Sequence, residues 1–380
     1  MTRKISITTG TRAEYGILRP LLFEIQNSKS LELYLLVTGM HLSEKYGKTI
    51  NEIKKDGFKI FSKIPMMPNK DSTLESTKQL GHAIILFSQA FDKIKPDINL
   101  VLGDRDEMLA SSIAAYHMNI PNAHIHGGDR SKGGIDEYNR HAITKMSNIH
   151  FAASKKSKSR IIKMGEDPKH VFFTGSPSID DVVSKKIIGK EFLEKKYDIK
   201  FSGDEIILLQ HSVTTQIDES EKQILSTLDA IRKIGKKTIA IAPNSDPGNS
   251  AIFRALKKYS KKFDFIKFYS NVPRDDYLGF LKYGGVLVGN SSSGMIEASY
   301  FGIPVINIGI RQIGREHGKN VIDVDHSSKK ILQAIKKCLK TNVVRKTDKI
   351  YGDGNSSKII IKYLENIKLN NDILKKQIRY

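Results

Sequence analysis

Short apolar runs rich in β-branched residues alternate along the chain with longer stretches whose apolar residues recur at helical spacing. This alternation is typical of parallel βαβ units. It predicts strands at residues 5–9, 33–38, 98–102, 123–126, 149–152 and 171–174, and again at 205–210, 238–242, 265–268, 286–288, 305–308 and 321–324. The helices that it predicts include residues 15–27, 73–95, 106–118, 219–234, 252–259, 292–300 and 329–339.

The predicted strands fall into two groups of about six, which form two sheets more readily than one very wide sheet. The weakest region between them spans residues 175–204, where glycine, proline and a short turn flank a charged helix. We therefore expect an α/β protein with two Rossmann-like domains, residues 1–175 and 176–355. A last helix at residues 356–380 carries an apolar stripe and is expected to pack back on the first domain.

Unusual polar segments follow several of the predicted strands. In open parallel sheets, ligands bind beyond the carboxyl ends of the strands. In the first half these segments are GTRAEY (10–15), GDR (103–105) and HGGD (126–129); in the second half they are HSVTT (211–215), the turn that contains Asn244, and GNSSSG (289–294). We expect the two sheet edges to face one another across a substrate cleft, with Asn244 among its binding residues.

The segment GNSSSG is the best-defined candidate binding site. A strand enters it and a predicted helix leaves it, so backbone N–H groups and the helix dipole would favour an anion there. The hydroxyls of Ser291 and Ser292 add donors for phosphate oxygens. The alternative is a plain helix cap made by Ser293. A capping box on Ser293 would place Glu or Gln at position 296, where this chain has Ile296. Glu297 therefore has no capping role there, and we expect it to accept hydrogen bonds from ribose hydroxyls.

Two arginines complete this candidate anion site. Arg12 and Arg311 each follow a predicted strand, and a guanidinium suits a forked grip on pyrophosphate. The segment has neither the GKS/GKT ending of a P-loop nor a G-x-G-x-x-G fingerprint, so we expect neither bound NAD nor any other cofactor.

Candidate acid–base groups gather at the same strand ends: Asp104, His126, Asp129, Asp136, Glu137 and His211. Asp104 has a helix N-cap as its alternative role, and Asp136 and Glu137 could simply begin the helix that follows. His124 and His126 would point the same way on a strand, which raises the question of a metal. A third ligand would be needed, so we expect no metal site.

Composition narrows the class of protein. Hydrophobic residues make up 39% and charged residues 27% of the 380 residues, and no run approaches the roughly 18 apolar residues of a membrane span. The N-terminal segment lacks a signal-peptide pattern, and the only cysteine, Cys338, cannot form an internal disulfide. We expect a cytoplasmic protein with no membrane partner. The net charge of +21 could indicate nucleic-acid binding, but the lysines are spread along the chain. We interpret it as a solvated surface that also attracts anionic substrates, with no nucleic-acid partner.

At these residues the sequence resembles the UDP-N-acetylglucosamine 2-epimerases, and most of all their hydrolysing branch, which opens sialic-acid-type biosynthesis. The resemblance runs nearly end to end. It is carried by eight segments in order: GTRAEY (10–15), GDR (103–105), IDE (135–137) with RHAITK (140–145), QHSVTT (210–215), GNSSSG (289–294), GIPVIN (302–307), RQIGRE (311–316) and YGDGN (351–355). The resemblance implies a GT-B-like fold, two doubly wound parallel-sheet domains facing a central cleft, and a nucleotide-sugar as the substrate.

The resemblance also implies a mechanism. A base removes the C2 proton of the sugar as UDP leaves C1, giving a 2-acetamidoglucal; water then adds at C1, and C2 is reprotonated on the opposite face. N-acetylmannosamine and UDP are the products from UDP-N-acetylglucosamine. By family position, Asp104, Asp136, Arg140 and His211 line the sugar site, and Arg311 and Glu297 help to hold the nucleotide. Arg12, Ser291 and Ser292 would stabilise the charge that develops on UDP.

One departure concerns His126, since some members of the family have a glutamate at this position. Either His126 takes over that acid–base role, or Asp129 does, or the base is Asp104 or Asp136 and His126 positions the sugar. The donor also stays open: a UDP-linked diacetamido-trideoxy sugar or a GDP-linked sugar fits the same framework. A non-hydrolysing epimerase and a GT-B glycosyltransferase are the rival activities, and the expected assembly is a homo-oligomer, a dimer or tetramer.

Overall fold

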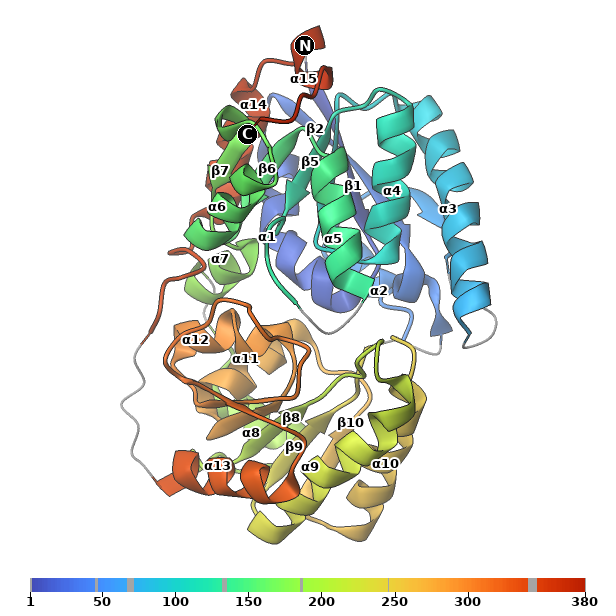
Figure 1. Cartoon of the computed structure of the whole chain (residues 1–380). Helices are drawn as coiled ribbons and strands as arrows, with labels where there is room; N and C mark the ends of the chain where they lie inside the picture. The colour runs from blue at the N-terminus through green and yellow to red at the C-terminus, as the bar shows by residue number, and fades with distance from the viewer. Residues whose placement is uncertain are drawn as a thin grey trace. The chain divides into compact units, whose positions relative to one another are not determined.

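The computed structural model describes residues 2–44, 47–66, 72–131, 135–184, 187–244, 246–340 and 347–379. The chain divides into two compact units (Figure 1). Unit 1 comprises Met1–Asp129, Asp136–Val183 and Tyr351–Tyr380, and unit 2 comprises Arg130–Ile135 and Ser184–Ile350. Each is a parallel sheet with helices between its strands, as the alternating pattern predicts.

In its described residues, unit 1 has a seven-stranded parallel sheet in the order β3-β2-β1-β4-β5-β6-β7. Its strands are β1 (Arg3–Thr9), β2 (Leu31–Thr38), β3 (Ile60–Ile64), β4 (Ile98–Leu102), β5 (Asn122–Ile125), β6 (Ile149–Ala152) and β7 (Val171–Phe173). Its helices are α1 (Arg12–Asn27), α2 (Ile50–Lys55), α3 (Thr73–Ile94), α4 (Asp106–His117), α5 (Ile135–Met146), α6 (Lys155–Lys163), α7 (Pro177–Ser184), α14 (Ser356–Asn366) and α15 (Asn371–Leu374).

Strand β3 is a strand that the sequence prediction omits. It pairs only with β2, at the edge of the sheet, and its side chains are mostly half-buried or exposed. Such an edge strand lacks the continuous apolar run by which a central parallel strand is recognised. The prediction of about six strands was therefore one short for this unit.

Apolar side chains cover both faces of the sheet of unit 1. On one face α1 and α14 pack together over the central strands, where Leu18 and Leu22 of α1 and Ile360 and Leu364 of α14 belong to one buried cluster. On the other face, α3 and α4 form a second cluster around Phe87 and other residues. The helix predicted over residues 356–380 was too long, because α14 ends at Asn366 and only the short α15 follows.

Unit 2 has a six-stranded parallel sheet in the order β10-β9-β8-β11-β12-β13 across its described residues. Its strands are β8 (Ile206–Leu209), β9 (Thr238–Ile241), β10 (Ile266–Tyr269), β11 (Val286–Gly289), β12 (Val305–Ile308) and β13 (Val321–Val324). Its helices are α8 (Lys190–Tyr197), α9 (Ser220–Ile234), α10 (Asn249–Lys262), α11 (Arg274–Tyr283), α12 (Glu297–Phe301) and α13 (Ser328–Lys340). Helices α9, α10 and α13 share one buried cluster with the strands.

The sheet topology puts the polar turns of each unit side by side. Strands β1, β4 and β5 of unit 1 are neighbours in the sheet, and so are β8, β11 and β12 of unit 2. Because all these pairings are parallel, the turns after the strands meet at one edge of each sheet. No helix among the described residues is long and apolar enough to cross a membrane.

Candidate active site

Asp104 lies at the carboxyl edge of the sheet of unit 1, directly after the fully buried strand β4. Gly103 turns the chain there with a φ of +83°, a backbone conformation that glycine adopts without strain. The alternative role of Asp104 as a helix N-cap was wrong. The N-cap of α4 is Arg105, and no side chain caps that helix. The carboxylate of Asp104 instead pairs with Arg140 of α5.

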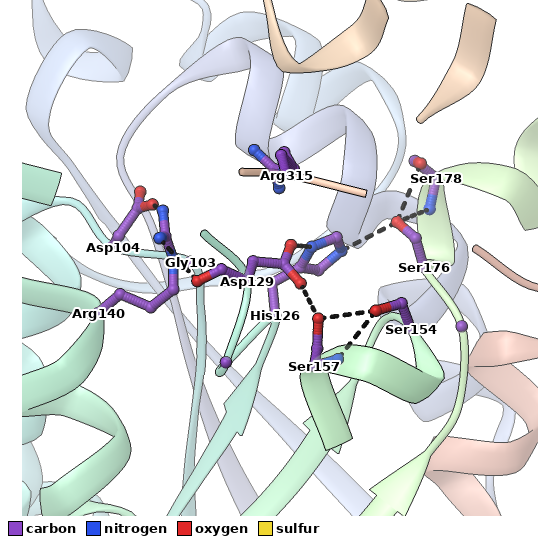
Figure 2. A network of polar contacts seen from close by, with 12 residues as sticks. Gly103, Asp104, His126, Asp129, Arg140, Ser154, Ser157, Ser176, Ser178 and Arg315 are labelled. Carbon is purple, nitrogen blue, oxygen red and sulfur yellow. Dashed lines mark hydrogen bonds and ion pairs between the residues drawn. The ribbon is translucent and has the colours of Figure 1, made fainter. Parts of the chain in front are cut away.

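Arg140 is the centre of a polar network, although only 1% of it is exposed. Its Nη2 donates to Oδ2 of Asp104, and its Nη1 donates to the backbone carbonyl of Asp129 at 3.0 Å and to Oε2 of Glu137 at 2.5 Å (Figure 2). A buried guanidinium with several acceptors suits the forked geometry of arginine. The network thus joins α5 to the turns after β4 and β5.

His126 and Asp129 form a second buried pair of this network. Nδ1 of His126 lies 2.9 Å from Oδ2 of Asp129, and both side chains are almost fully buried. The strand predicted to include His126 ends at Ile125, because His126 has a left-handed φ of +66°. The metal argument assumed that His124 and His126 point the same way along one strand. Because His126 lies beyond the strand in a left-handed turn, that assumption was wrong. The ring of His124 binds the carbonyl of Gly103 and the hydroxyl of Thr144.

Asp136 and Glu137 lie in the first turn of α5, where acidic side chains favour a helix start. Both are half-buried, and Glu137 also pairs with Arg140. Asp136 lies one turn before Arg140 on the same helix. The structure thus brings Asp104, His126, Asp129 and Arg140 into one network, with Asp136 one helical turn before Arg140. Among the described residues, no group of three or more potential metal ligands occurs.

In unit 2, three predicted residues gather around Asn290. The side chain of Asn290 accepts from the backbone N–H of His211 at 2.7 Å and donates to the carbonyl of His211 at 2.9 Å. Nδ1 of His211 accepts from the backbone N–H of Asn244 at 3.1 Å. Nη1 of Arg311 donates to the carbonyl of Asn290 at 3.2 Å. Four strand ends, those of β8, β9, β11 and β12, therefore meet at one polar site.

The segment GNSSSG differs from its predicted form. A short 3₁₀ turn covers Ser292–Gly294, and the five-residue helix α12 begins only at Glu297. The helix predicted at 292–300 was therefore too long, and it offers no helix dipole at Ser291. Ser291 accepts from the backbone N–H of Ser293, so Ser291 is the cap that the prediction assigned to Ser293. Ser291 and Ser292 are half-buried.

Glu297 is buried and is held by an arginine that the prediction did not include. Nη1 of Arg274 donates to Oε1 of Glu297 at 3.2 Å. Ser293 is held in turn by Tyr277, whose hydroxyl lies 2.5 Å from Oγ of Ser293. Burial raises the pKa of Tyr277 above its usual range. Arg274 and Tyr277 both belong to α11, so this helix holds Glu297 and Ser293 through hydrogen bonds.

Arg12 is the first residue of α1 and is half-buried, directly after its N-cap Thr11. The turn that holds it covers two buried carboxyl groups, those of Glu14 and Glu107. A Cβ at Gly10 would come within 2.9 Å of the Glu107 carboxyl, so a larger residue there would displace that side chain. Burial, and then the charge of Glu107, raise the pKa of Glu14 from 4.5 to about 8.

We expect Glu14 to make the free energy of unfolding fall as the pH rises toward about 8. The folded protein binds the Glu14 proton more tightly than the unfolded chain does, so its contribution is complete below pH 4.5 and is lost through about pH 8. The buried His41 and His124, whose pKa values burial lowers to about 4 and about 3, act below pH 6.5. Urea unfolding should show a loss of roughly 1–2 kcal/mol between about pH 6.5 and about pH 8 that Glu14→Gln lacks. Equal losses in both proteins would refute the assignment.

Several residues of these networks were not predicted from the sequence. They are Tyr277, Arg274 and Asn290, together with Ser157, which binds Asp129, and Ser176, which contacts His126. Asn290 lies inside a segment already identified, and Ser176 lies in the turn after strand β7, so the rule of strand ends applied to it as well. That turn was instead interpreted as part of a domain boundary. Tyr277 and Arg274 lie within a helix and carry no signal in the sequence.

Comparison with known proteins agrees with this architecture. A Neisseria meningitidis UDP-GlcNAc 2-epimerase, solved bound to UDP-GlcNAc, has a TM-score of 0.79 with this chain at 21% identity, over 95% of this chain and 99% of that one. The predicted GT-B-like class, with doubly wound parallel sheets, is confirmed.

The family follows from the sequence comparisons. Residues 23–365 match the UDP-N-acetylglucosamine 2-epimerase family, and the chain belongs to it. It is 38% identical over 376 residues to a Legionella pneumophila UDP-N,N'-diacetylbacillosamine 2-epimerase (hydrolyzing), covering 99% of both chains. It is 36% identical over 323 residues to a Campylobacter jejuni GDP/UDP-N,N'-diacetylbacillosamine 2-epimerase (hydrolyzing), covering 84% of both. The chain is therefore an enzyme of this family.

Proposed function

We propose that this enzyme is a hydrolysing 2-epimerase that converts a UDP-linked 2-acetamido sugar and water into UDP and the free C2 epimer of that sugar. The observation that carries the proposal is the Asp104–Arg140 pair. The Asp104 side chain keeps 24% of its surface exposed at the carboxyl edge of the sheet, whereas that of Asp129 keeps none. Glu137 of the same network is 22% exposed, but Asp104 is the one that follows a strand, where ligands of a parallel sheet bind. We therefore propose that Asp104 meets the substrate, together with Asp136.

The reaction needs two acid–base groups, because the C2 proton leaves one face of the sugar and returns to the other. We assign these roles to Asp104 and Asp136. One carboxylate takes the C2 proton as the C1–O bond to UDP breaks, which gives the 2-acetamidoglucal. Water then adds its oxygen at C1 as the second carboxylic acid gives its proton to C2. The proton that this water loses returns to the second carboxylate, and the first carboxylic acid releases the abstracted C2 proton to solvent. Arg140 holds Asp104 in place through its ion pair with that carboxylate.

The polar site of unit 2 supports the role of nucleotide binding. Arg311 is fixed by the carbonyl of Asn290, and Ser291 and Ser292 add hydroxyl donors nearby in the chain. We propose that these groups, with Arg12, take the diphosphate and stabilise its charge as it leaves. His211 and Asn244 would contact the sugar end, and Glu297, held by Arg274, would accept from the ribose hydroxyls.

The names of these two relatives support a diacetamido-trideoxy sugar as the preferred donor. Both are named hydrolysing diacetylbacillosamine 2-epimerases, one of them for GDP or UDP donors. UDP-N-acetylglucosamine, the donor bound in the Neisseria meningitidis structure, is the second candidate. The two sugars share the C2 acetamido group on which the reaction depends and differ at C4 and C6.

Both donors can be tested in one assay in D₂O followed by NMR. With UDP-N,N'-diacetylbacillosamine we expect UDP and the free C2 epimer carrying deuterium at C2, at a kcat/KM at least about tenfold above that for UDP-N-acetylglucosamine. The reverse ranking would restore UDP-N-acetylglucosamine and N-acetylmannosamine as substrate and product. Epimers still linked to UDP would refute hydrolysis in favour of the non-hydrolysing reaction. Turnover only with an added sugar acceptor would indicate a glycosyltransferase.

A further inference from the structure

His126 is held on both sides of its ring. Nδ1 lies 2.9 Å from Oδ2 of Asp129, and Nε2 lies 2.9 Å from Oγ of Ser176 (Figure 2). His126 is 4% exposed, Asp129 1% and Ser176 not at all. The order of groups is serine, histidine, aspartate, and all three side chains lie inside unit 1. Each ring nitrogen therefore has a protein partner, and neither is directed to solvent.

The hydrogen bonds of Asp129 fix the position of the ring proton. A carboxylate can only accept hydrogen bonds, so Nδ1 of His126 must carry its proton toward Oδ2. The other oxygen, Oδ1, accepts from the hydroxyl of Ser157 at 2.7 Å, and Ser157 is bound in turn by Ser154. In a neutral ring, Nε2 then has only a lone pair, and the hydroxyl of Ser176 is the donor that meets it.

The backbone prevents this ring from turning away. His126 has its left-handed φ in the turn after β5, and Gly128 has a φ of +72° two residues later. A Cβ at Gly128 would lie 2.4 Å from the carbonyl oxygen of Ser157, so the turn packs directly on α6. Arg160 of α6 also donates to the carbonyl of Gly128 at 2.5 Å. Such backbone strain persists only where the surroundings over-determine it.

Ser176 is fixed as firmly as the ring that it contacts. Its backbone N–H donates to the carbonyl of Tyr351 at 2.8 Å, and its hydroxyl lies 3.0 Å from that of Ser178. Tyr351 is 1% exposed and begins the YGDGN segment. The backbone at Tyr351, where the chain re-enters unit 1 after unit 2, therefore helps to fix the position of Ser176.

We propose that Ser176 is a positioning residue that, together with Asp129, holds His126 as a neutral Nδ1–H imidazole. Through Asp129, whose carbonyl binds Arg140, this arrangement sets the position of the Asp104 carboxylate. His126 then exchanges no proton with the sugar. The inference about turnover rests on the proposed function, whereas the protonation state of the ring does not.

The protonation state can be measured directly on the full chain. With ¹⁵N-labelled histidine, the His126 resonances are identified as those missing from His126→Asn, because asparagine tolerates a left-handed φ. We expect a protonated Nδ1 and an unprotonated Nε2 in the wild type. A ring protonated at Nε2 instead, or at both nitrogens near pH 7, would overturn the proposal. This measurement decides even if no nucleotide-sugar is turned over, or if the serine variant fails to fold.

The kinetic test compares two buried serines. Ser176→Ala should lower kcat about tenfold and change KM less than about twofold, since the loss of one hydrogen bond shifts Asp104 rather than removing a binding contact. Ser111→Ala is the control: Ser111 is equally buried, and its hydroxyl binds Thr8 and Asn99. It should change kcat less than about twofold. Equal values for the two variants, or a rise in KM alone, would refute a positioning role.

Discussion

Replacing Asp104 by asparagine is expected to lower kcat by roughly 10²–10⁴-fold while the protein stays folded. The amide keeps the size of the side chain but cannot take the C2 proton. Since Asp104 is partly exposed and lies in a turn after β4, the sheet does not depend on its charge. The same variant should lose the incorporation of deuterium at C2 in D₂O, measured by NMR under single-turnover conditions.

Glu137→Gln provides the matched control for this prediction. Glu137 binds the same guanidinium, and its side chain is 22% exposed against 24% for Asp104. If the loss in Asp104→Asn arose only from a weakened hold on Arg140, both variants would lose activity equally. We expect Glu137→Gln to lose less than about tenfold, because it removes a negative charge beside Arg140 while its amide oxygen can still accept from the guanidinium. Equal losses would remove Asp104 from the role of base.

The central strands could be predicted from the sequence because both faces of a parallel sheet are buried. Strands β4, β6 and β12 match their predicted bounds residue for residue, and each is a run of buried positions. Strand β3 was missed for the opposite reason. Its sequence, IFSKI, includes a serine and a lysine, which an edge strand tolerates and a central one does not. The edge strands β7, β10 and β13 were predicted, so the pattern fails at an edge only where polar residues interrupt the apolar run, as in β3.

The site was predictable only as far as the rule of strand ends reaches. That rule placed Asp104 and His126 at one edge, because β4 and β5 are neighbours, and it placed His211 with Asn244 at another. The rule does not predict where the side chains of a helix point. The pairing of Arg140 with Asp104, 36 positions earlier, depends on how α5 packs. The left-handed turn at His126 likewise depends on its contacts with α6 rather than on its own sequence.

The predicted anion site shows how a local motif can mislead. Small residues after a strand predict a helix N-terminus, yet the chain forms a 3₁₀ turn before α12. Tyr277 explains part of this difference, because its hydroxyl forms a hydrogen bond that ties Ser293 of the turn to α11. The candidate for phosphate binding thus rests on hydroxyls and on Arg311, rather than on a helix dipole.

Replacing Arg140 by methionine is expected to cost both stability and activity. Methionine fills much of the buried volume but leaves the carbonyl of Asp129 without this donor and removes the cation between Asp104 and Glu137. We expect the free energy of unfolding to fall by about 2–3 kcal/mol, less than for a fully buried pair, because both carboxylates still reach water. Urea unfolding measures this loss, and kcat should fall at least about tenfold.

Arg140→Lys separates the charge of Arg140 from its geometry. A lysine keeps the positive charge, but its single ammonium group cannot reach three acceptors from two turns and one helix as a planar guanidinium does. If geometry decides, Arg140→Lys will regain part of the stability and little of the activity, since Asp104 stays misplaced. Recovery of kcat to within about twofold of the wild type would show that only the charge beside Asp104 matters. In that case the network from Ser176 through His126 and Asp129 would not affect turnover. Arg140→Lys therefore also tests the proposed link between Ser176 and Asp104, at Arg140 rather than at Ser176.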